Sequence, residues 1–300
     1  MKILITGATG FVGKAVTQSL LKAGHHVCVL TRSMPQAQEK FGKTVDIIEW
    51  NLNQEPLPKR YFENLNAIVH LAGESIDARW TKRKKENILS SRVVSTQNLL
   101  ANIPREGLVF ISTSAQGIYG DQGESLVDES SSYGHDFLAE VCQQWEAPVH
   151  EMRRQAKNRV LILRLGMVLS SQGGALKKML SIYKSNLGAV VGSGDQWISW
   201  IHRDDVVGII TEALQNKTYE GVFNISTENP VQNKQWTKQL CKELRVMQWP
   251  RIPAFALKLI LGEMASIVLN SVRMKPAALL RCHYQYKYPN LSDVFKAELS

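Results

Sequence analysis

The sequence predicts an α/β protein: a Rossmann-type doubly wound parallel sheet with a smaller, mostly helical C-terminal lobe. Three observations predict this. Short apolar runs alternate with helical patterns up to Leu165, a glycine-rich segment separates the first strand from the first helix, and the alternation stops after Leu165. Strands that alternate with helices are typical of parallel βαβ units, whose right-handed crossovers place helices on both faces of the sheet.

Each element follows from a local pattern. Apolar runs predict strands at Lys2–Thr6, His26–Leu30, Val45–Trp50, Ala67–Leu71, Leu108–Ser112 and Val160–Leu165. Helical periodicity predicts helices over Phe11–Ala23, Lys82–Asn102, His135–Ala156 and Asp204–Gln215, and Val222–Ile225 is expected to return a strand to the sheet. We therefore expect an NADP-binding Rossmann domain at residues 1–165 and a substrate-binding lobe at 166–300, with about 204–228 returning to the Rossmann sheet.

Composition limits the function classes. The formal net charge is +9, but the charge is spread along the chain except for the run Lys82–Lys85. That run follows Thr81, a suitable helix N-cap, and is typical of a solvated first turn rather than of a nucleic-acid surface. The four cysteines lack paired spacing, and His25 and His26 lie at a helix end and strand start outside any metal-binding motif, so we expect a reducing compartment and no metal site.

The chain is predicted to be cytoplasmic and not to contact membranes. Lys2 leads directly into a short apolar run and glycine-rich sequence, unlike a signal peptide. The longest apolar stretch, 252–272, contains Lys258 and Glu263, which do not suit a membrane span. Apolar residues recur at helical spacing in it and predict one amphipathic helix. These residues are Leu257, Leu261, Met264 and Val268.

The segment Thr6–Gly13 has the pattern G-x-x-G-x-x-G between a strand and a helix. Gly7 permits a tight turn, Gly10 lets the backbone approach a pyrophosphate, and Gly13 lets the helix pack closely on the strand. The free N–H groups of the helix N-terminus favour phosphate binding. The predicted phosphate-binding residues are Thr6, Gly7, Thr9, Gly10, Phe11, Val12 and Gly13.

The end of the second strand indicates the cofactor. A site for NAD usually places an acidic residue there to accept a hydrogen bond from the ribose 2′-OH. This chain has Thr31-Arg32-Ser33 instead. The Arg32 guanidinium suits a 2′-phosphate, to which Thr31 and Ser33 would add hydroxyls, so we predict NADP(H). A surface arginine without this role is the alternative.

These residues resemble the extended short-chain dehydrogenase/reductases, which include NAD-dependent epimerases and dehydratases. A narrower resemblance is to a subgroup of atypical "epimerase family proteins" with a C-terminal domain of unknown function. The match implies that Leu71, Ala72, Gly73 and Glu74 run past the cofactor. Besides the glycine loop, the segments that carry the resemblance are His70–Glu74, Ile111–Ser114, Ile118–Gly120, Asp136–Cys142, Trp145-Glu146, Arg164–Gly166, Trp200–Val206, Pro276, Leu279-Leu280 and Tyr288-Pro289.

The catalytic pattern of the superfamily, Tyr-x-x-x-Lys, is missing, because no tyrosine here has a lysine four residues later. The resemblance implies that Ser114 hydrogen-bonds a substrate oxygen. Tyr119 and Tyr133 are the nearest candidate acids by sequence. For Tyr119 the alternative is a purely structural role without proton transfer. For Ser114 the alternative is that its hydroxyl only forms hydrogen bonds with backbone groups at a strand end.

Two functions remain open. The first is an enzyme, an NADP(H)-dependent oxidoreductase or nucleotide-sugar epimerase, and the second is a non-catalytic NADP(H) sensor or regulator. A tyrosine without a neighbouring lysine is an adequate acid but a poor base at neutral pH, which favours reduction. The expected partners are a small-molecule substrate, with anionic and nucleotide-sugar-like compounds as candidate classes, and no nucleic acid or membrane. The chain is expected to be a monomer or homodimer.

Overall fold

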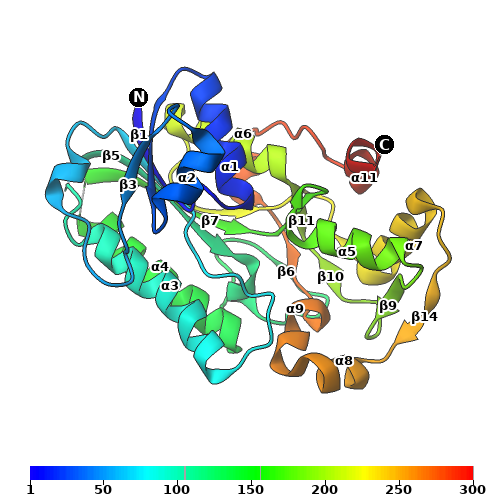
Figure 1. The fold of residues 1–300 in the computed structure, drawn as a ribbon. Helices are drawn as coiled ribbons and strands as arrows, with labels where there is room; N and C mark the ends of the chain where they lie inside the picture. Colours follow the sequence, from blue (N-terminus) through cyan, green and yellow to red (C-terminus); the bar gives the residue numbers. More distant parts are fainter. Residues whose placement is uncertain (105, 156, 300) are drawn as a thin grey trace.

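The computed structural model describes residues 1–104, 106–155 and 157–299. Its centre is a seven-stranded sheet in the order β12-β7-β5-β4-β1-β2-β3, in which every pairing is parallel. The strands are β1 (Lys2–Thr6), β2 (His26–Thr31), β3 (Asp46–Glu49), β4 (Ala67–His70), β5 (Glu106–Ala115), β7 (Lys157–Leu165) and β12 (Gly221–Ile225). This architecture confirms the predicted fold class (Figure 1).

Helices cover both faces of this sheet. One face carries α1 (Phe11–Lys22), α2 (Met34–Phe41) and α6 (Arg203–Gln215), and the other carries α3 (Lys82–Leu100) and α4 (Phe137–Gln155). Ala156, the last residue of the predicted helix 135–156, lies outside the described residues. The sequence prediction omitted α2, a short helix of eight residues that buries only Ala37 and Phe41.

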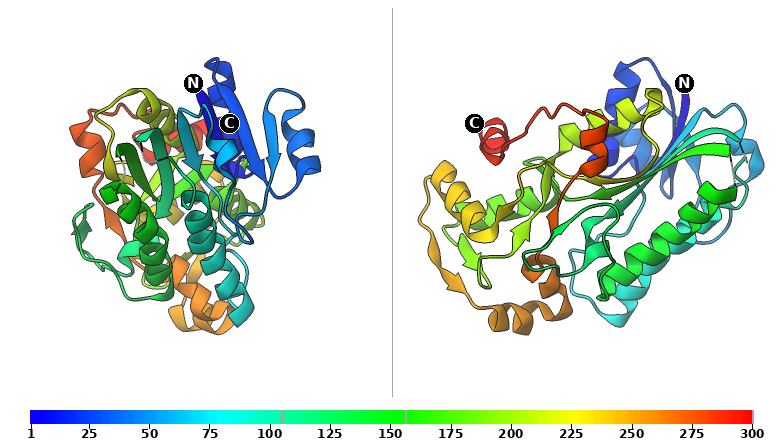
Figure 2. Two further views of the ribbon diagram at one scale, coloured as in Figure 1. Left: turned by 90° about the vertical axis from the view of Figure 1, so that its left-hand side faces the viewer. Right: turned by 180° about the vertical axis from the view of Figure 1, so that it is seen from behind.

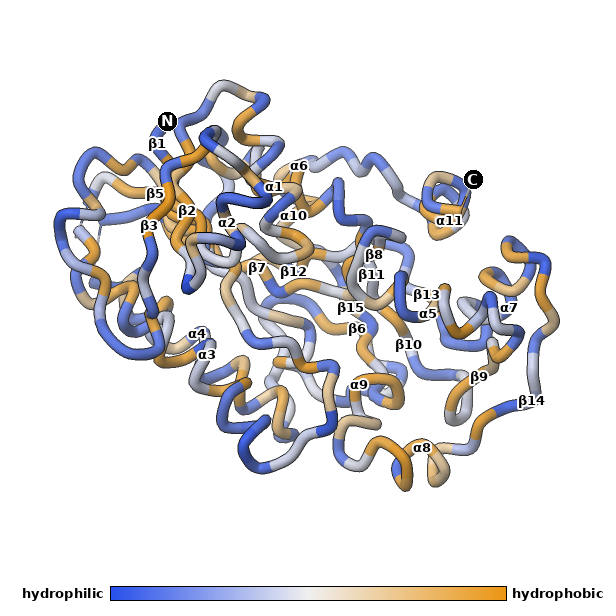
Figure 3. The backbone as a smooth tube through the Cα atoms, viewed as in Figure 1, coloured by the Kyte–Doolittle hydropathy of each residue, from blue (hydrophilic) through white to orange (hydrophobic). Residues whose placement is uncertain are grey.

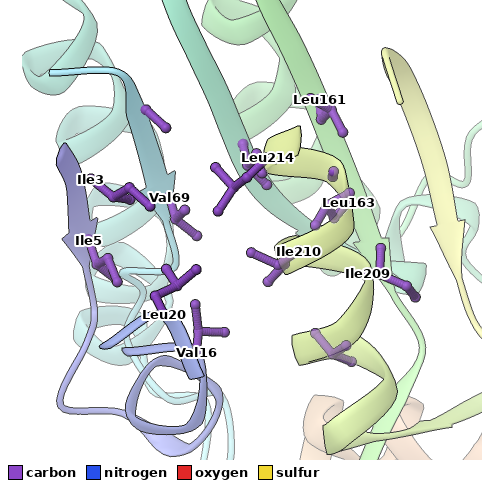
Figure 4. Close-up of a cluster of buried hydrophobic side chains, with 14 of the residues drawn as sticks. Ile3, Ile5, Val16, Leu20, Val69, Leu161, Leu163, Ile209, Ile210 and Leu214 are labelled. Carbon is purple, nitrogen blue, oxygen red and sulfur yellow. The ribbon is translucent and has the colours of Figure 1, made fainter. Parts of the chain in front are cut away.

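The alternation of strand side chains explains the two cores. On one face, Ile3, Ile5 and Val69 of the sheet pack with α1 and with α6, whose Ile209 and Ile210 are fully buried (Figure 4). On the other face, Leu4, Cys28 and Ile68 belong to the core that includes residues of α3 and α4. Although α6 and β12 follow the break at Leu165, they complete the Rossmann layer, since β12 pairs with β7.

A second lobe lies beside the sheet (Figures 1 and 2). Its core surrounds the buried Trp236 and joins α5 (Gly174–Lys184), α7 (Asn233–Leu244) and α11 (Leu291–Leu299). Two other short elements, η1 (Lys59–Phe62) and α10 (Ala277–Arg281), pack against the two faces of the sheet. The remaining short elements of the chain are η2 (Gln116–Tyr119), β6 (Leu126–Val127), β8 (Met167–Ser170), β9 (Ala189–Val191), β10 (Trp197–Ile198), β11 (Trp200–His202), β13 (Val231–Gln232), β14 (Trp249–Ile252) and β15 (Arg273–Met274).

The single amphipathic helix predicted for residues 252–272 is wrong. The segment divides into α8 (Ala254–Leu261), η3 (Gly262–Ala265) and α9 (Ser266–Leu269). Gly262 has φ of +61°, a left-handed conformation that suits glycine and ends α8. No residue of α8 is buried, and Leu259 is 82% exposed, so an apolar helix lies on the surface (Figure 3). Among the described residues, no helix is long and apolar enough to span a bilayer.

Candidate cofactor and catalytic site

A cavity of about 320 Å³ opens at the carboxyl ends of the strands. It lies where the strand order reverses, between β1 and β4, which is the usual ligand site of doubly wound sheets. Its walls are Thr6, Gly7, Thr9, Gly10, Leu30, Thr31, Arg32, Ser33, Gln36, Trp50, Asn51, Leu52, Asn53, Leu71, Ala72, Gly73, Glu74, Ser91 and Ser95.

The cavity brings together most of the predicted cofactor residues, from the glycine loop, the end of β2 and the segment after β4. Phe11, Val12 and Gly13 lie behind the loop, in the first turn of α1. Sequence reasoning missed Gln36, Asn51–Asn53, Ser91 and Ser95. These residues belong to α2, the segment after β3, and α3, and no local motif marks them as cofactor contacts.

The glycines shape the loop between β1 and α1. Gly7 has φ of +69°, and a Cβ there would lie 2.6 Å from the carbonyl oxygen of Leu71. A Cβ on Gly13 would lie 2.1 Å from the carbonyl oxygen of Gly7, so the helix can start this close to the loop only with glycine. A Cβ on Gly10 would meet the Gly7 carbonyl oxygen at 3.1 Å, a tight contact rather than a collision.

The N-terminus of α1 is open to an anion. Its N-cap is Gly10, no side chain caps the helix, and its first turn holds no acidic residue. The first amides of a helix have no intrahelical partner and carry the positive end of its dipole. Lys40 of α2 donates to the carbonyl oxygen of Thr9 at 2.6 Å and adds a positive charge beside the loop. This arrangement fits the pyrophosphate of a dinucleotide.

A buried hydrogen-bond chain holds the segment after β4 against the loop. The Thr6 hydroxyl accepts from the amides of Leu71 and Ala72 at 3.2 Å and lies 2.7 Å from Nδ1 of His70. Nε2 of His70 lies 3.0 Å from Thr96 Oγ1, which donates to a backbone carbonyl. The chain is therefore complete with His70 neutral, and burial lowers the pKa of His70 to about 4.

The charges around the cavity favour an anionic ligand. Arg32 is exposed at the cavity wall, while the acidic wall residue, Glu74, pairs with Lys84 at 2.7 Å. The hydrogen bond from Lys84 is the main cause that lowers the pKa of Glu74, and the charges of Arg32 and Arg92 also lower it. Glu74 therefore stays ionised, with its charge offset by lysine and arginine neighbours.

A second polar cluster, the Arg164 cluster, lies at the end of β5 and β7. Arg164 is 1% exposed and contacts Glu146 twice, at 2.9 Å through Nε and 2.8 Å through Nη2. Burial opposes ionisation of Glu146, but hydrogen bonds from His150 and Arg164 outweigh it and the pKa of this carboxyl lies below its ordinary value. The buried guanidinium and carboxylate thus form a paired, fixed unit.

The Arg164 cluster includes all three candidate catalytic residues. Ser114 pairs with Arg164 in the register of β5 and β7, so both side chains leave the sheet on the same face. The hydroxyls of Tyr119 and Tyr133 accept from the guanidinium at 3.0 and 3.2 Å. The buried Ser114 hydroxyl lies beside Glu146 and Cys142 and helps to lower the pKa of each. The cluster is on the strand next to β4, and β4 leads into the cavity residues Leu71–Glu74.

The two tyrosines differ in access. Tyr119 is fully buried, and its hydroxyl also donates to Asn224 Oδ1 at 2.6 Å. Burial is the main cause that raises the pKa of Tyr119 to about 12. Tyr133 is 41% exposed, and its hydroxyl is bonded only to Arg164 among the described residues. Of the two phenols, Tyr133 is the one that a bound molecule can reach.

No lysine stands four residues after Tyr133, which lies in the loop before α4. Phe137 stands four residues later, at the start of α4, and its ring packs against Trp80 with centroids 5.2 Å apart. Lys85 of α3 lies over the Phe137 ring at 4.5 Å, but its ammonium group pairs with Glu263 of η3. The cation that contacts the tyrosine hydroxyl in this structure is therefore Arg164.

Comparisons with known proteins agree with this geometry. Residues 3–226 match the NAD dependent epimerase/dehydratase family, and residues 252–298 match a domain of unknown function, DUF1731. The chain is 37% identical over 302 residues to Epimerase family protein SDR39U1 homolog, chloroplastic, of Arabidopsis thaliana, covering 99% of this chain and 86% of the relative. It is 32% identical over 295 residues to Epimerase family protein YfhF of Bacillus subtilis, covering 97% and 95%.

Solved structures show the same fold. Human epimerase family protein SDR39U1 (isoform 2), crystallised with NADPH, superposes with a TM-score of 0.86 and 28% identity over 99% of both chains. The UDP-glucose 4-epimerase of Thermotoga maritima, solved with UDP-glucose, has a TM-score of 0.79 at 19% identity over 100% and 97% of the chains, a likeness of fold alone. The resemblance predicted from the sequence is thereby confirmed: this chain belongs to the NAD dependent epimerase/dehydratase family.

Proposed function

We propose that this protein is an NADPH-dependent reductase that adds hydrogen to a carbonyl group of a small molecule. The observation that carries the cofactor choice is Arg32, which lines the cavity at the end of β2 where a site for NAD usually has an acidic residue. The NADPH of the human relative, at 28% identity, supports the same choice. The glycine loop and the uncapped α1 would hold the pyrophosphate, and Arg32 the 2′-phosphate.

NADPH, when bound, supplies a hydride. The chain then has to bind the carbonyl oxygen and supply a proton to it. The Ser114 hydroxyl, which lies in the Arg164 cluster, would donate a hydrogen bond to that oxygen. Tyr133 would give its hydroxyl proton to the same oxygen, and the Arg164 guanidinium at 3.2 Å would stabilise the phenolate left behind. Because Tyr133 is partly exposed, water can return its proton.

The Arg164 cluster favours reduction over epimerisation. Epimerisation through a keto intermediate needs a group that accepts a proton in one step and donates it in the next. A phenol is protonated at neutral pH, so it is ready to donate. Arg164 is bound to Glu146 and has no proton to exchange, so it supports Tyr133 only as a fixed cation.

The test is consumption of NADPH with aldehydes, ketones and 4-keto nucleotide sugars, together with the reverse assay with NADP⁺ and UDP-sugars. Reductase activity that falls in Tyr133→Phe and Ser114→Ala supports the proposal. Tyr61→Phe is the matched control, because the Tyr61 hydroxyl contacts only the nearby Arg60 among the described residues. Epimerised UDP-sugar without net NADPH consumption would overturn it in favour of an epimerase. NADPH binding without turnover of any compound would favour a sensor.

A further inference from the structure

Three side chains that could bind a metal ion meet at the amino ends of β2 and β3. His26 and Cys28 are two residues apart on β2 and therefore lie on the same face of the sheet. Asp46, the first residue of β3, pairs with Cys28 in the register of the two strands. Sequence spacing did not indicate this group, because β3 brings in the third residue from 18 positions further along the chain.

The ligand atoms are already close together. Nε2 of His26 lies 2.6 Å from Oδ2 of Asp46, and Sγ of Cys28 lies 3.8 Å from the same oxygen. The three ligand atoms all lie within 4.8 Å of one another. With bonds of about 2.3 Å to sulfur and about 2.0–2.1 Å to nitrogen and oxygen, a tetrahedral zinc ion needs ligand atoms roughly 3.3–3.7 Å apart. Cys28 and Asp46 are near that spacing, and a rotation of the exposed His26 ring would supply the rest.

We propose that His26, Cys28 and Asp46 form a zinc site that links the edge strand β3 to β2. One nitrogen, one sulfur and one oxygen ligand suit Zn²⁺ and not the all-oxygen preference of Mg²⁺ or Ca²⁺. Water would take the fourth position, because the His26 and Asp46 side chains are 59% and 62% exposed.

The fold gives such a link a physical role. β3 has four residues and pairs on one side only, because it ends the sheet. A metal ion between β2 and β3 would add a bond that an edge strand otherwise lacks. The site lies at the amino ends of the strands, whereas the cofactor cavity opens at their carboxyl ends, so the two sites can be tested separately.

The surroundings of Cys28 favour its protonated thiol. Burial, and then the nearby Asp46 carboxylate, raise the pKa of the Cys28 thiol to about 11, so the thiol is protonated at neutral pH without metal. Lys2, which pairs with His26 in the register of β1 and β2, is a nearby cation that acts in the opposite direction.

The experiment is a zinc titration of the metal-free full-length protein against a chromogenic chelator. We expect one Zn²⁺ per chain, a higher Tm with Zn²⁺ than with Mg²⁺, and affinity that drops roughly tenfold or more in Asp46→Asn and Cys28→Ala. His25→Ala and Cys282→Ala are the matched controls and should bind like the wild type. Asp46 is exposed, so its variant remains informative even if Cys28→Ala folds poorly.

Spectroscopy gives an independent readout. X-ray absorption of the zinc-loaded protein should show one sulfur neighbour beside nitrogen and oxygen. Equal zinc affinity in the wild type and Asp46→Asn, a zinc shell without sulfur, or loss of binding in His25→Ala alone would overturn the proposal. NADPH affinity should be the same with and without Zn²⁺, which keeps this test separate from that of the proposed function.

Discussion

Arg164 donates a hydrogen bond to the hydroxyl of Tyr133 at 3.2 Å, and its guanidinium centre lies 5.2 Å from the centre of the Tyr133 ring. In the family pattern, a lysine four residues after the tyrosine supports the tyrosine hydroxyl. Here a buried arginine on β7 contacts the hydroxyl from across the fold, 31 residues away in sequence. The missing lysine therefore does not leave Tyr133 without a cationic neighbour.

Replacement of the two tyrosines should separate catalysis from stability. Tyr133→Phe should lower kcat about 10²–10⁴-fold with little change in urea unfolding, because an exposed tyrosine loses the hydroxyl proposed to donate a proton. Tyr119→Phe should cost about 1–3 kcal/mol of stability, because Asn224 and Arg164 lose a buried partner. Stability is read from urea midpoints and activity from NADPH absorbance. Tyr133 would be removed from the mechanism if Tyr133→Phe lost stability and kept its activity while Tyr119→Phe lost activity and kept its stability.

Loss of Arg164 should be strongly destabilising. Arg164→Met leaves Glu146, 3% exposed, without its cation, at a cost of about 3–5 kcal/mol in the free energy of unfolding. Arg164→Met combined with Glu146→Leu should recover much of that loss, since no buried charge then lacks a partner. Calorimetric unfolding of both variants checks this. Additive losses in the double variant would show that the two side chains act independently.

Arg32 should determine the preference for NADPH. Arg32→Ala should weaken NADPH binding by about 1.5–3 kcal/mol and leave NADH binding nearly unchanged, because only NADPH offers a 2′-phosphate to the guanidinium. Isothermal titration with both cofactors measures this, with the exposed Arg154→Ala on α4 as control. Equal affinity of the wild type for NADPH and NADH would contradict the assignment.

Substitutions of the two loop glycines Gly10 and Gly13 should have different effects on cofactor binding and stability. Gly10→Val should abolish cofactor binding while the fold is kept, because the added carbons would occupy space needed by the pyrophosphate. Gly13→Ala should also lower the Tm, since its Cβ would collide with the Gly7 carbonyl oxygen at 2.1 Å. Circular dichroism melts and NADPH titration distinguish the two. Cofactor binding retained in Gly10→Val would show that the phosphates lie elsewhere.

Glu298 should make the stability of the fold depend on pH in the acidic range. It accepts from the Ser171 amide at 2.6 Å and contacts His202 Nε2 at 2.7 Å, so it attaches α11 to the second lobe. Burial opposes its ionisation, but the hydrogen bonds from Ser171 and His202 outweigh burial and lower its pKa from 4.5 to about 2. A carboxyl with a depressed folded pKa stabilises the fold above pH 4.5, and this contribution is lost as the pH falls toward 2.

Glu298→Gln removes that contribution. The difference in unfolding free energy between the wild type and the variant should be largest above pH 4.5 and should shrink as the pH falls toward 2. Urea unfolding between pH 3 and pH 7 measures it. The buried, neutral His70 also favours unfolding as the pH falls from 6.5 toward 4, but equally in both proteins, so the difference isolates Glu298. A pH-independent difference would contradict the assignment.

The local sequence was sufficient to predict the sheet and the loop. Strand Lys2–Thr6 and the start of α1 at Phe11 agree with the structure to the residue, because apolar periodicity and the glycine pattern are local signals. The turn at Gly7 likewise depends on backbone sterics that only glycine satisfies. The helical pattern of 252–272 did not predict the end of α8 at Gly262 or the exposure of this helix, because only the tertiary structure shows what covers an apolar helix.

The tertiary structure decided which side chains meet. The sequence by itself determined that no lysine stands four residues after Tyr133, that Arg32 stands where an acid is usual, and that Ser114 lies close to the end of a strand. Only the folded chain brings Arg164 to Tyr133 and Asp46 to His26, over separations of 31 and 20 residues. The periodicity of apolar residues in the sequence reflects which face of a single helix or strand is buried. A contact between two elements depends on strand order and register, which arise when the whole core packs.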